Sequence, residues 1–250
     1  MLDFSYFCPS METKTRAVVL RALKYGEAQI IVDLFTREQG RLSFICKLPK
    51  TSKGRVKKQF FQPLSLLDII FDYRQNLSLQ HFRDIRLAQP FVSIPFDAGK
   101  LSISLFLAEF LTCSLRGEQR NEQLYSYVEN SLMWLDNVQE HFANFHLVFM
   151  MRLSMFIGFF PNLDDFHDGW WFDLRNGDFT PMRPSHPDSL APADAKEMHS
   201  LMRMTYENMH LFKMNREQRN RCTDIILYFY RLHVPGFPQL RSLDVMKELF

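Results

Sequence analysis

The sequence predicts an α+β protein: a small β-barrel followed by a mainly helical domain that carries a short hairpin insert. Between positions 15 and 90, hydrophobic residues occur in short runs separated by turn residues, a pattern typical of strands. After position 98 they recur with a period of about 3.6 residues, which is typical of amphipathic helices. With 250 residues, 46% of them hydrophobic, the chain can bury a core in each domain. The predicted division is a possible N-terminal extension at 1–10, a barrel domain at 11–92 and a helical domain at 93–250.

Five β-like segments occupy the first part of the chain. They are rich in Ile, Leu, Val and Phe, and turn residues such as Gly26, Gly40 and Gly54 separate them. An open sheet of this size would leave unprotected edges, so five strands in about 75 residues favour a closed or nearly closed barrel. One half of a β-sandwich is the alternative. The predicted strands are 15–23, 28–36, 41–48, 64–73 and 77–87.

Helical periodicity begins after Pro90 and Pro95 end the last strand. In the first helix, Leu101 and Leu105 are predicted to share an inward face with the apolar residues that follow them. Such stripes predict the core of a helical bundle rather than a cofactor site. The predicted helical segments are 101–115, 124–135, 145–157, 198–209, 225–232 and 240–250.

A non-helical insert at about 161–190 interrupts the helices. Its Asn176-Gly177 pair predicts a β-hairpin with a type I′ turn, because both residues accept positive φ angles. The aromatic residues of the insert either pack onto the bundle or form a partner-binding knob. They are Trp170, Trp171, Phe172 and Phe179.

Signatures of catalysis are missing from the sequence. The nine glycines form no phosphate-binding loop, and neither a His-Glu-x-x-His motif nor a Gly-x-Ser-x-Gly elbow occurs. Glu109 and Arg152 lie on apolar helical faces and are expected to form a structural ion pair rather than an acid/base site. One cluster resembles a metal site but also has the composition of a polar loop: Asp164, Asp165, His167 and Asp168. No catalytic residue and no cofactor is predicted.

The cysteines and the apolar segments bear on cellular location. No two cysteines lie close together in the sequence, which argues against a zinc knuckle or a disulfide framework. The start lacks the features of a signal peptide, and the most apolar segments, 101–113 and 145–160, are too short and too polar to span a membrane. We therefore expect a reduced cytoplasmic protein without a membrane partner. The cysteines are Cys8, Cys46, Cys113 and Cys222.

The net charge of +2 conceals a basic first part and a mildly acidic remainder. Residues 11–90 hold 15 Lys and Arg against 7 Asp and Glu, and no acidic residue occurs between Glu38 and Asp68. A solvated loop is the simplest explanation of this run, but a flexible loop beside basic strands also suits a nucleic-acid backbone. Rings that could stack on bases, although most are expected in the core, are Phe44, Phe60, Phe61 and Tyr73. The predicted DNA-binding residues are Arg16, Arg21, Lys24, Arg37, Arg41, Lys47, Lys50, Lys53, Arg55, Lys57, Lys58 and Arg74.

Several short motifs follow one another in a recognisable order. In the first domain they are Arg16-Ala-Val-Val-Leu-Arg21, Tyr25-Gly26-Glu27, Asp33-Leu-Phe-Thr36, Gly40-Arg41-Leu42, Lys47 and Gln62-Pro63. In the second they are Phe149-x-x-Arg152-Leu153, Gly158, Pro161-x-Leu163 and Leu243-Asp-Val-Met-Lys-Glu-Leu249. In order and spacing, across nearly the whole chain, these motifs resemble the RecO family of bacterial recombination mediators.

The resemblance implies an N-terminal OB-fold, a helical C-terminal domain and work in DNA repair by the RecF pathway. Members of the family bind single- and double-stranded DNA, anneal complementary strands, associate with RecR and engage single-stranded-DNA-binding protein so that RecA can load. Many also carry a four-cysteine zinc module, whereas Phe166 and Gly169 stand where its first Cys-x-x-Cys would fall. We therefore expect no structural zinc, with the aromatic hairpin at 170–180 in its place.

The sequence thus predicts a non-enzymatic DNA repair and recombination mediator, located in the cytoplasm and associated with the nucleoid. The acidic, hydrophobic tail of single-stranded-DNA-binding protein would need a cation beside an apolar groove. Candidates for that cation, each with a structural or solvated role as the alternative, are Arg152, Arg216, Arg219 and Arg221. Two other functions stay open: a metal-dependent DNA-processing enzyme that uses the 164–168 cluster, and a pure protein-interaction adaptor.

Overall fold

The computed structural model describes residues 11–47, 57–162 and 166–249. The chain divides into two compact units. The barrel unit comprises Met1–Phe91 and Leu115–Glu129, and the helical unit comprises Val92–Ser114 and Asn130–Phe250. A stretch of helical sequence after residue 114 therefore belongs to the unit that contains the strands.

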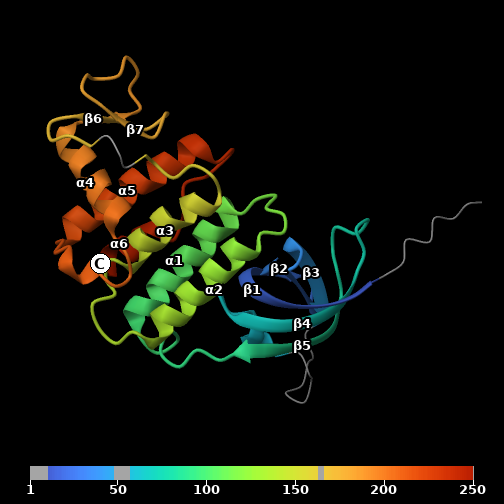
Figure 1. Cartoon of the computed structure of the whole chain (residues 1–250). Coiled ribbons are helices and arrows are strands. Elements are labelled where there is room, and N and C mark those ends of the chain that lie inside the picture. Colours follow the sequence, from blue (N-terminus) through green and yellow to red (C-terminus); the bar gives the residue numbers. More distant parts are fainter. Residues whose placement is uncertain (1–10, 48–56, 163–165, 250) are drawn as a thin grey trace, which may run out of the picture. The chain divides into compact units, whose positions relative to one another are not determined.

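Five antiparallel strands of the barrel unit form one sheet in the order β3-β2-β1-β4-β5 (Figure 1). A parallel bridge between Phe44 and Gln80 joins β3 to the segment before β5 and closes the sheet into a barrel. The predicted α+β class with an OB-like first domain is confirmed. The elements are β1 (Met11–Tyr25), β2 (Gln29–Thr36), β3 (Gly40–Lys47), the 3-10 helix η1 (Lys58–Phe61), β4 (Leu66–Tyr73) and β5 (Phe82–Gln89).

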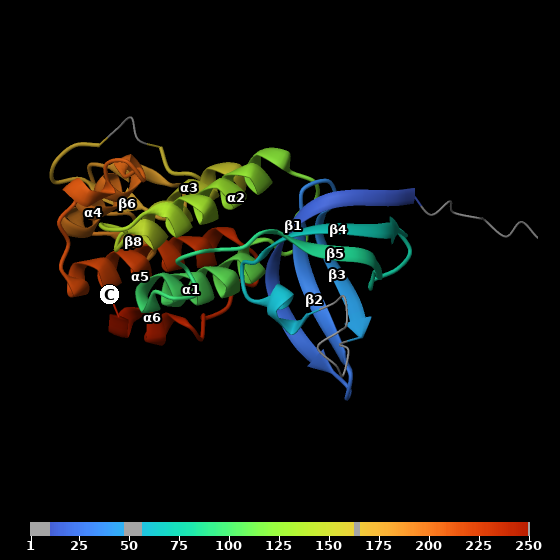
Figure 2. The same ribbon diagram turned by 90° about the horizontal axis from the view of Figure 1, so that it is seen from below.

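Strand β1 is long enough to serve both halves of the barrel. Residues 11–18 pair with β4, and residues 17–25 pair with β2. A register shift between Val19 and Arg21 marks a β-bulge, which bends the strand where it passes from one partner to the other. The curved course of β1 is visible in Figure 2.

The barrel interior is filled by side chains that alternate with outward-facing ones along each strand. Aromatic rings lie at its centre: Phe44 stacks on Phe82 at 4.4 Å between ring centroids and meets Phe71 edge-on at 5.0 Å. Aliphatic residues from all five strands surround these rings. The remaining buried members of the cluster are Ala17, Val19, Ile30, Val32, Leu34, Phe61, Leu67, Ile69 and Ile85.

The helical segment of the barrel unit packs on the outer side of β2 at Phe35, near the end of that strand. Helix α2 (Glu122–Asn137) begins in this unit, and the Asn121 side chain accepts a hydrogen bond from the backbone N–H of Leu124 at 3.0 Å. Tyr125 is fully buried and packs against Phe35 of β2 at 5.8 Å between ring centroids. Burial of this ring raises the pKa of its hydroxyl. Phe35 therefore faces away from the barrel interior and still lies in a core.

The helical unit contains the remaining helices and a second, three-stranded sheet in the order β7-β6-β8. Figure 1 shows β6 and β7 beside α4, which contacts β6. Among the described residues, no helix combines the length and the apolarity that crossing a membrane requires. The elements are α1 (Ala98–Ser114), α3 (Phe145–Phe156), β6 (Trp171–Asp173), β7 (Asp178–Thr180), β8 (Ser189–Leu190), α4 (Pro192–Arg203), η2 (Met209–Leu211), α5 (Arg216–His233) and α6 (Leu243–Leu249).

The predicted inward face of the first helix is wrong in part. Leu101 and Leu105 are 41% and 43% exposed, whereas Ile103, Phe106 and Phe110 are buried. Helix α1 buries residues around almost its whole circumference, including three polar ones in its first two turns. A stripe of leucines therefore did not identify the buried side, because burial here follows the surrounding elements rather than one amphipathic face.

The hairpin insert forms, but its turn differs from the predicted type I′. Residues 174–177 connect β6 to β7, and of these Gly177 alone has a positive φ, so Asn176 does not adopt the conformation that a type I′ turn needs. The Asp173 carboxylate provides the reason, since it accepts hydrogen bonds from the backbone N–H groups of Arg175 (2.8 Å) and Asn176 (3.2 Å). These bonds stabilise a longer turn in which only the last residue is left-handed.

The aromatic residues of the insert divide between two environments. Phe172 and Phe179 are buried, and the Phe172 ring lies 6.3 Å from that of Phe229 on α5. Trp171 is half-buried beneath the guanidinium of Arg183, at 5.4 Å from the ring centroid. The two phenylalanines therefore pack onto the helices, as one of the two predicted arrangements requires.

The expected ion pair between Glu109 and Arg152 does not form. Glu109 instead accepts hydrogen bonds from the backbone N–H groups of Arg241 and Ser242, at 3.0 and 2.8 Å, just before α6. Burial would raise the pKa of this carboxyl, but these bonds and one from the Ser242 hydroxyl outweigh it, so the pKa lies below its ordinary value. Arg152 donates to the Met204 carbonyl at 3.4 Å. The prediction paired two isolated charges on apolar helical faces with each other, whereas each of them bonds to backbone groups instead.

A buried histidine should make the helical unit sensitive to acid. His146 of α3 is fully buried, with Nε2 at 3.2 Å from the Thr223 hydroxyl. Burial, with a smaller contribution from Arg219, lowers its pKa to about 3. The unfolded chain takes up this proton near pH 6.5, so the contribution of His146 to stability is complete above that pH and falls as the pH drops towards 3.

At pH 5 this single group is expected to reduce the free energy of unfolding by about 2 kcal/mol relative to pH 7. Urea unfolding at the two pH values measures the change. The His146→Gln variant cannot take up the proton and should lose correspondingly less stability between pH 7 and 5. An equal loss in both proteins would contradict a neutral buried His146.

Candidate nucleic-acid interface

The structure separates the predicted DNA-binding residues into groups on different surfaces of the barrel unit. Three of them, Lys50, Lys53 and Arg55, lie outside the described residues. The other nine belong to the barrel unit, on its strands, turns and the start of η1. A cation binds a phosphate well only where no neighbouring carboxylate neutralises it, and the groups differ in the carboxylates beside them.

One group lies on the outer side of β1, β2 and β3, which we call the β1–β3 surface. Its residues alternate with the core residues of the same strands and share rows across the sheet. Arg21, Asp33 and Ser43 form one row, and Tyr25, Gln29 and Lys47 form another at the end of the strands. The surface comprises Arg21, Leu23, Tyr25, Gln29, Ile31, Asp33, Arg41, Ser43, Ile45 and Lys47.

A buried carboxylate organises the middle of the β1–β3 surface. Asp33 accepts hydrogen bonds from Nε of Arg21 at 2.6 Å, Nη2 of Arg41 at 3.1 Å and Oγ of Ser43 at 2.5 Å. Burial alone would raise the pKa of Asp33, but the bonds from Ser43, Arg21 and Arg41 outweigh it and hold the pKa below its ordinary value. Asp33 therefore stays ionised and fixes two guanidinium groups with a net charge of +1. Arg21 remains half exposed, and its fork of donors exceeds what Asp33 uses.

Exposed apolar side chains flank these charges. Tyr25 and Leu23, near the end of β1, are 54% and 48% exposed. Tyr25 was not predicted as a stacking residue, although its position directly before the turn glycine Gly26 at a strand end was a usable signal. Phe44 and Phe61 are buried in the barrel core and cannot stack on bases, as expected for most of the four rings, and Phe60 and Tyr73 pack partly buried against the same core.

Five predicted cations are exposed and form no ion pair with another described residue. Lys47, at the end of β3, belongs to the Tyr25 row, whereas Lys24, one residue before Tyr25 on β1, pairs with Ile30 and so points to the other face of the sheet. Lys57 and Lys58 lie at the start of η1, and Arg74 follows β4. Of these five, Lys47 shares the β1–β3 surface with Arg21 and Arg41, which Asp33 holds in place.

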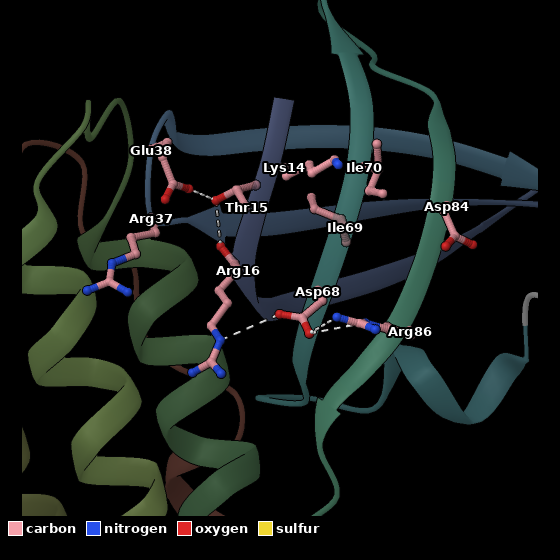
Figure 3. Close-up of a pocket in the computed structure, with 10 residues that line it drawn as sticks. All are labelled: Lys14, Thr15, Arg16, Arg37, Glu38, Asp68, Ile69, Ile70, Asp84 and Arg86. Carbon is pink, nitrogen blue, oxygen red and sulfur yellow. Dashed lines mark hydrogen bonds and ion pairs between the residues drawn. The ribbon is translucent and has the colours of Figure 1, made fainter. Parts of the chain in front are cut away.

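The outer side of β1, β4 and β5 is different, because its cations are matched by acids. Figure 3 shows Arg16, Asp68 and Arg86 in a row across the three strands. Asp68 lies 3.5 Å from Nε of Arg16 and 3.2 Å from Nη2 of Arg86, and Arg16 also donates to Glu129 at 2.9 Å. These residues border a cleft of about 450 Å³ that is lined by four cations and three carboxylates.

Arg37, at the edge of the same cleft, is also engaged. Its Nε lies 3.2 Å from Glu122 at the start of α2, and Glu38 beside it accepts a hydrogen bond from Thr15 (Figure 3). Burial raises the pKa of Glu38 despite the opposing effect of Arg37. Of the predicted cations, Arg16 and Arg37 are therefore the two whose charge is most nearly balanced by neighbouring carboxylates.

The metal-like cluster is only partly within the described residues. Asp164 and Asp165 lie outside them. His167 and Asp168 are exposed, and Asp168 is 3.5 Å from Nζ of Lys196. The part of the chain that the structure describes contains no group of three metal-binding side chains.

The four candidate partner-binding arginines do not form a cluster of free cations. Arg216 donates to the Lys247 carbonyl at 2.8 Å, and Arg221 pairs with Asp194 at 2.5 Å. Arg219 is half-buried and donates to Asn144 Oδ1 at 3.0 Å, and burial lowers its pKa. Arg152 makes a long bond to a backbone carbonyl, lies close enough to Glu207 to lower the pKa of that carboxyl, and is one turn before Met155, which is 49% exposed.

Comparison with known proteins agrees with the two-part organisation. The family model described as Recombination protein O N terminal matches residues 11–91, and the one described as Recombination protein O C terminal matches residues 95–244. The DNA repair protein RecO of Bacteroides fragilis is 49% identical over 241 residues, covering 96% of this chain and all of the relative. The corresponding proteins of Phocaeicola vulgatus and Flavobacterium psychrophilum are 47% and 31% identical, again over 96% of this chain and the whole relative. The chain therefore belongs to the RecO family of DNA repair proteins.

Proposed function

We propose that this chain is a non-enzymatic recombination mediator that binds single- and double-stranded DNA through the β1–β3 surface and the exposed lysines beside it. The observation that carries the proposal is unmatched positive charge on the barrel unit. Lys24, Lys47, Lys57 and Lys58 are exposed and form no ion pair with a described residue, and Lys47 shares a row of the sheet with the exposed ring of Tyr25. Phosphate contacts supply affinity that is independent of sequence, and an exposed ring can stack on any base.

Binding of this kind can promote annealing. Two DNA strands repel each other, and cations that neutralise phosphates on both lower the barrier to pairing. The cluster around Asp33 holds Arg21 and Arg41 in place before DNA arrives, so their ordering costs little on binding. No group on this surface needs to donate or accept a proton, and the proposal includes no catalytic step and no cofactor.

The proposed role includes protein partners, with the protein acting in the cytoplasm at the nucleoid. In this role it works with RecR and engages the C-terminal tail of single-stranded-DNA-binding protein. RecA can then load on DNA that single-stranded-DNA-binding protein covers. An acidic, apolar tail needs a cation beside apolar surface. Arg152 with Met155 on the same side of α3 fits this better than Arg216, Arg219 or Arg221, because those three have stronger partners within the helical unit.

An annealing assay tests the proposed activity. Two complementary oligonucleotides, one carrying a donor dye and the other an acceptor, should pair at least ten times faster with the protein than without it at about 0.1 M salt. The acceleration should shrink as the salt concentration rises, since it depends on screening of phosphate charge. An unchanged rate of strand pairing at every salt concentration would favour a pure adaptor. Shortening of the strands that requires magnesium, and that the Asp165→Asn variant no longer shows, would favour a nuclease.

A further inference from the structure

A groove of about 630 Å³ opens beside the β1–β3 surface and continues it. Arg41 and Ser43 belong to both. The far wall of the groove comes from the end of β4 and the loop between β4 and β5, through Tyr73 and Gln75. A third wall comes from the loop between α1 and α2, through Gln119 and Arg120. All of these residues belong to the barrel unit. The α1–α2 loop therefore adds a wall that the five strands alone do not provide.

The wall formed by the β4–β5 loop is held in place by one buried amide. The Gln80 side chain, 1% exposed, donates to the carbonyls of Arg74 and Leu77 at 2.9 and 2.8 Å and accepts from the Arg74 N–H at 3.1 Å. Its backbone also bonds to β3, to the Ser43 carbonyl at 2.8 Å and from the Ile45 N–H at 3.0 Å. The loop is thus tied both to itself and to the strand that forms the floor of the groove.

The wall formed by the α1–α2 loop is held by close backbone contact with the β2–β3 turn. The Arg41 N–H donates to the Glu118 carbonyl at 3.1 Å. A Cβ at Gly40 would lie only 2.5 Å from the Glu118 oxygen and from a backbone carbon of Gln119, so the approach requires glycine. A groove whose walls are fixed in this way is formed before a ligand arrives.

The chemistry of the lining suits one nucleotide. The side-chain amides of Gln39, Gln75 and Gln119 each offer a donor and an acceptor, and among the described residues no partner occupies them. Such amides can bond to the polar edge of any unpaired base. Tyr73 and Leu77 supply apolar surface for the base.

The charges of the groove suit the phosphate of the same nucleotide. Arg41 and Arg120 contribute two guanidinium groups, and Glu118 contributes one carboxylate. Arg120 is exposed, and its nearest carboxylate, that of Glu122, is 3.9 Å away. Arginine forks bind phosphate oxygens in pairs, so this end of the groove is the natural position for the backbone.

We propose that the groove binds a single unstacked nucleotide of a DNA strand that crosses the β1–β3 surface. The inference rests on the proposed DNA binding and adds to it a preference for single strands. A base in a duplex uses its pairing edge within the helix and cannot enter between the two loops, whereas an unpaired base can. The phosphate contacts on the β1–β3 surface serve either form of DNA, and the groove amides serve only the unpaired one.

Affinities of a single-stranded oligonucleotide and of the duplex of the same length test the inference. The variant Gln75→Ala/Gln119→Ala removes two exposed amides from the groove, and Gln123→Ala/Gln139→Ala removes two exposed amides elsewhere. We expect the first variant to bind the single strand about tenfold more weakly, with duplex affinity within about twofold of the unmodified protein. The second variant should match the unmodified protein on both.

The possible failures are distinguishable. Equal losses on single strand and duplex, or no loss on either, would overturn the nucleotide groove while leaving the proposed DNA binding in place. An unmodified protein that binds neither form would overturn the proposed function and the groove with it. A thermal unfolding curve that coincides with that of the unmodified protein establishes that the groove variant is folded.

Discussion

Reversal of four exposed lysines, in the variant Lys24→Glu/Lys47→Glu/Lys57→Glu/Lys58→Glu, is expected to weaken single-strand binding by several hundredfold at about 0.1 M salt. Each phosphate contact contributes about 0.7 to the dependence of log K on log salt, so four lost contacts remove nearly three powers of ten in affinity at that concentration. The lysines have no described ion-pair partner, so the fold should not change. Fluorescence anisotropy of a labelled oligonucleotide measures the loss.

A matched control separates local charge from net charge. The control reverses four exposed cations of the helical unit, which are Arg203, Lys213, Arg231 and Arg241. It lowers the total charge by the same amount, and these cations also form no ion pair with a described residue. This control should retain affinity within about fivefold of the unmodified protein, since its charges are screened over about 10 Å at 0.1 M salt. Comparable losses in both variants would show that DNA responds to net charge and not to this surface.

Replacement of Gly40 by alanine is expected to destabilise the barrel unit by about 2 to 3 kcal/mol. Gly40 has a φ of +69°, where a Cβ costs about 1 to 2 kcal/mol. The added Cβ would also approach the backbone of Glu118 and Gln119 to about 2.5 Å, which forces the α1–α2 loop away and strains the hydrogen bond from the Arg41 N–H. Urea unfolding at neutral pH gives the change in free energy.

Gly26 provides the control for this substitution. Its φ of +64° is nearly the same, and a Cβ there meets no atom within 4 Å. Gly26→Ala should therefore show only the conformational part of the loss, about 1 to 2 kcal/mol. If the two variants are equally stable, the contact between the β2–β3 turn and the α1–α2 loop contributes nothing, and the groove would have no fixed third wall.

Much of the fold could be predicted because its determinants are local. Alternating apolar runs between turn glycines predicted the five barrel strands, with β2, β3 and β4 within two residues of their observed bounds and the start of β5 five residues too early. The 3.6-residue period predicted that the helices exist, but it placed α4 six residues too late and the start of α5 nine residues too late. The inward face of α1 was assigned wrongly, because burial of Leu101 and Leu105 depends on which elements surround the helix and not on its own pattern. The turn at Asn176-Gly177 was wrong because a side chain outside the pair, Asp173, determines its length.

The candidate site was predictable only as a collection of residue types. Charge counts located the cations in the first part of the chain, but their partners come from positions distant in sequence. Glu129 and Glu122 pair with Arg16 and Arg37 across about 85 to 113 residues, and no local pattern predicts this. Asp33 was noticed as part of a motif, whereas its role in holding Arg21 and Arg41 requires the register of three strands. The groove depends on the α1–α2 loop, which carries no motif.

The salt dependence of single-strand affinity tests the central claim most directly. If the barrel unit contacts about five phosphates, log K should fall with log salt at a slope near −3.5 for the unmodified protein. The fourfold lysine reversal should bring the slope close to −0.7, because about one contact remains. A slope near zero in the unmodified protein, or an equally steep slope in the reversed one, would contradict DNA binding by the β1–β3 surface and the lysines beside it.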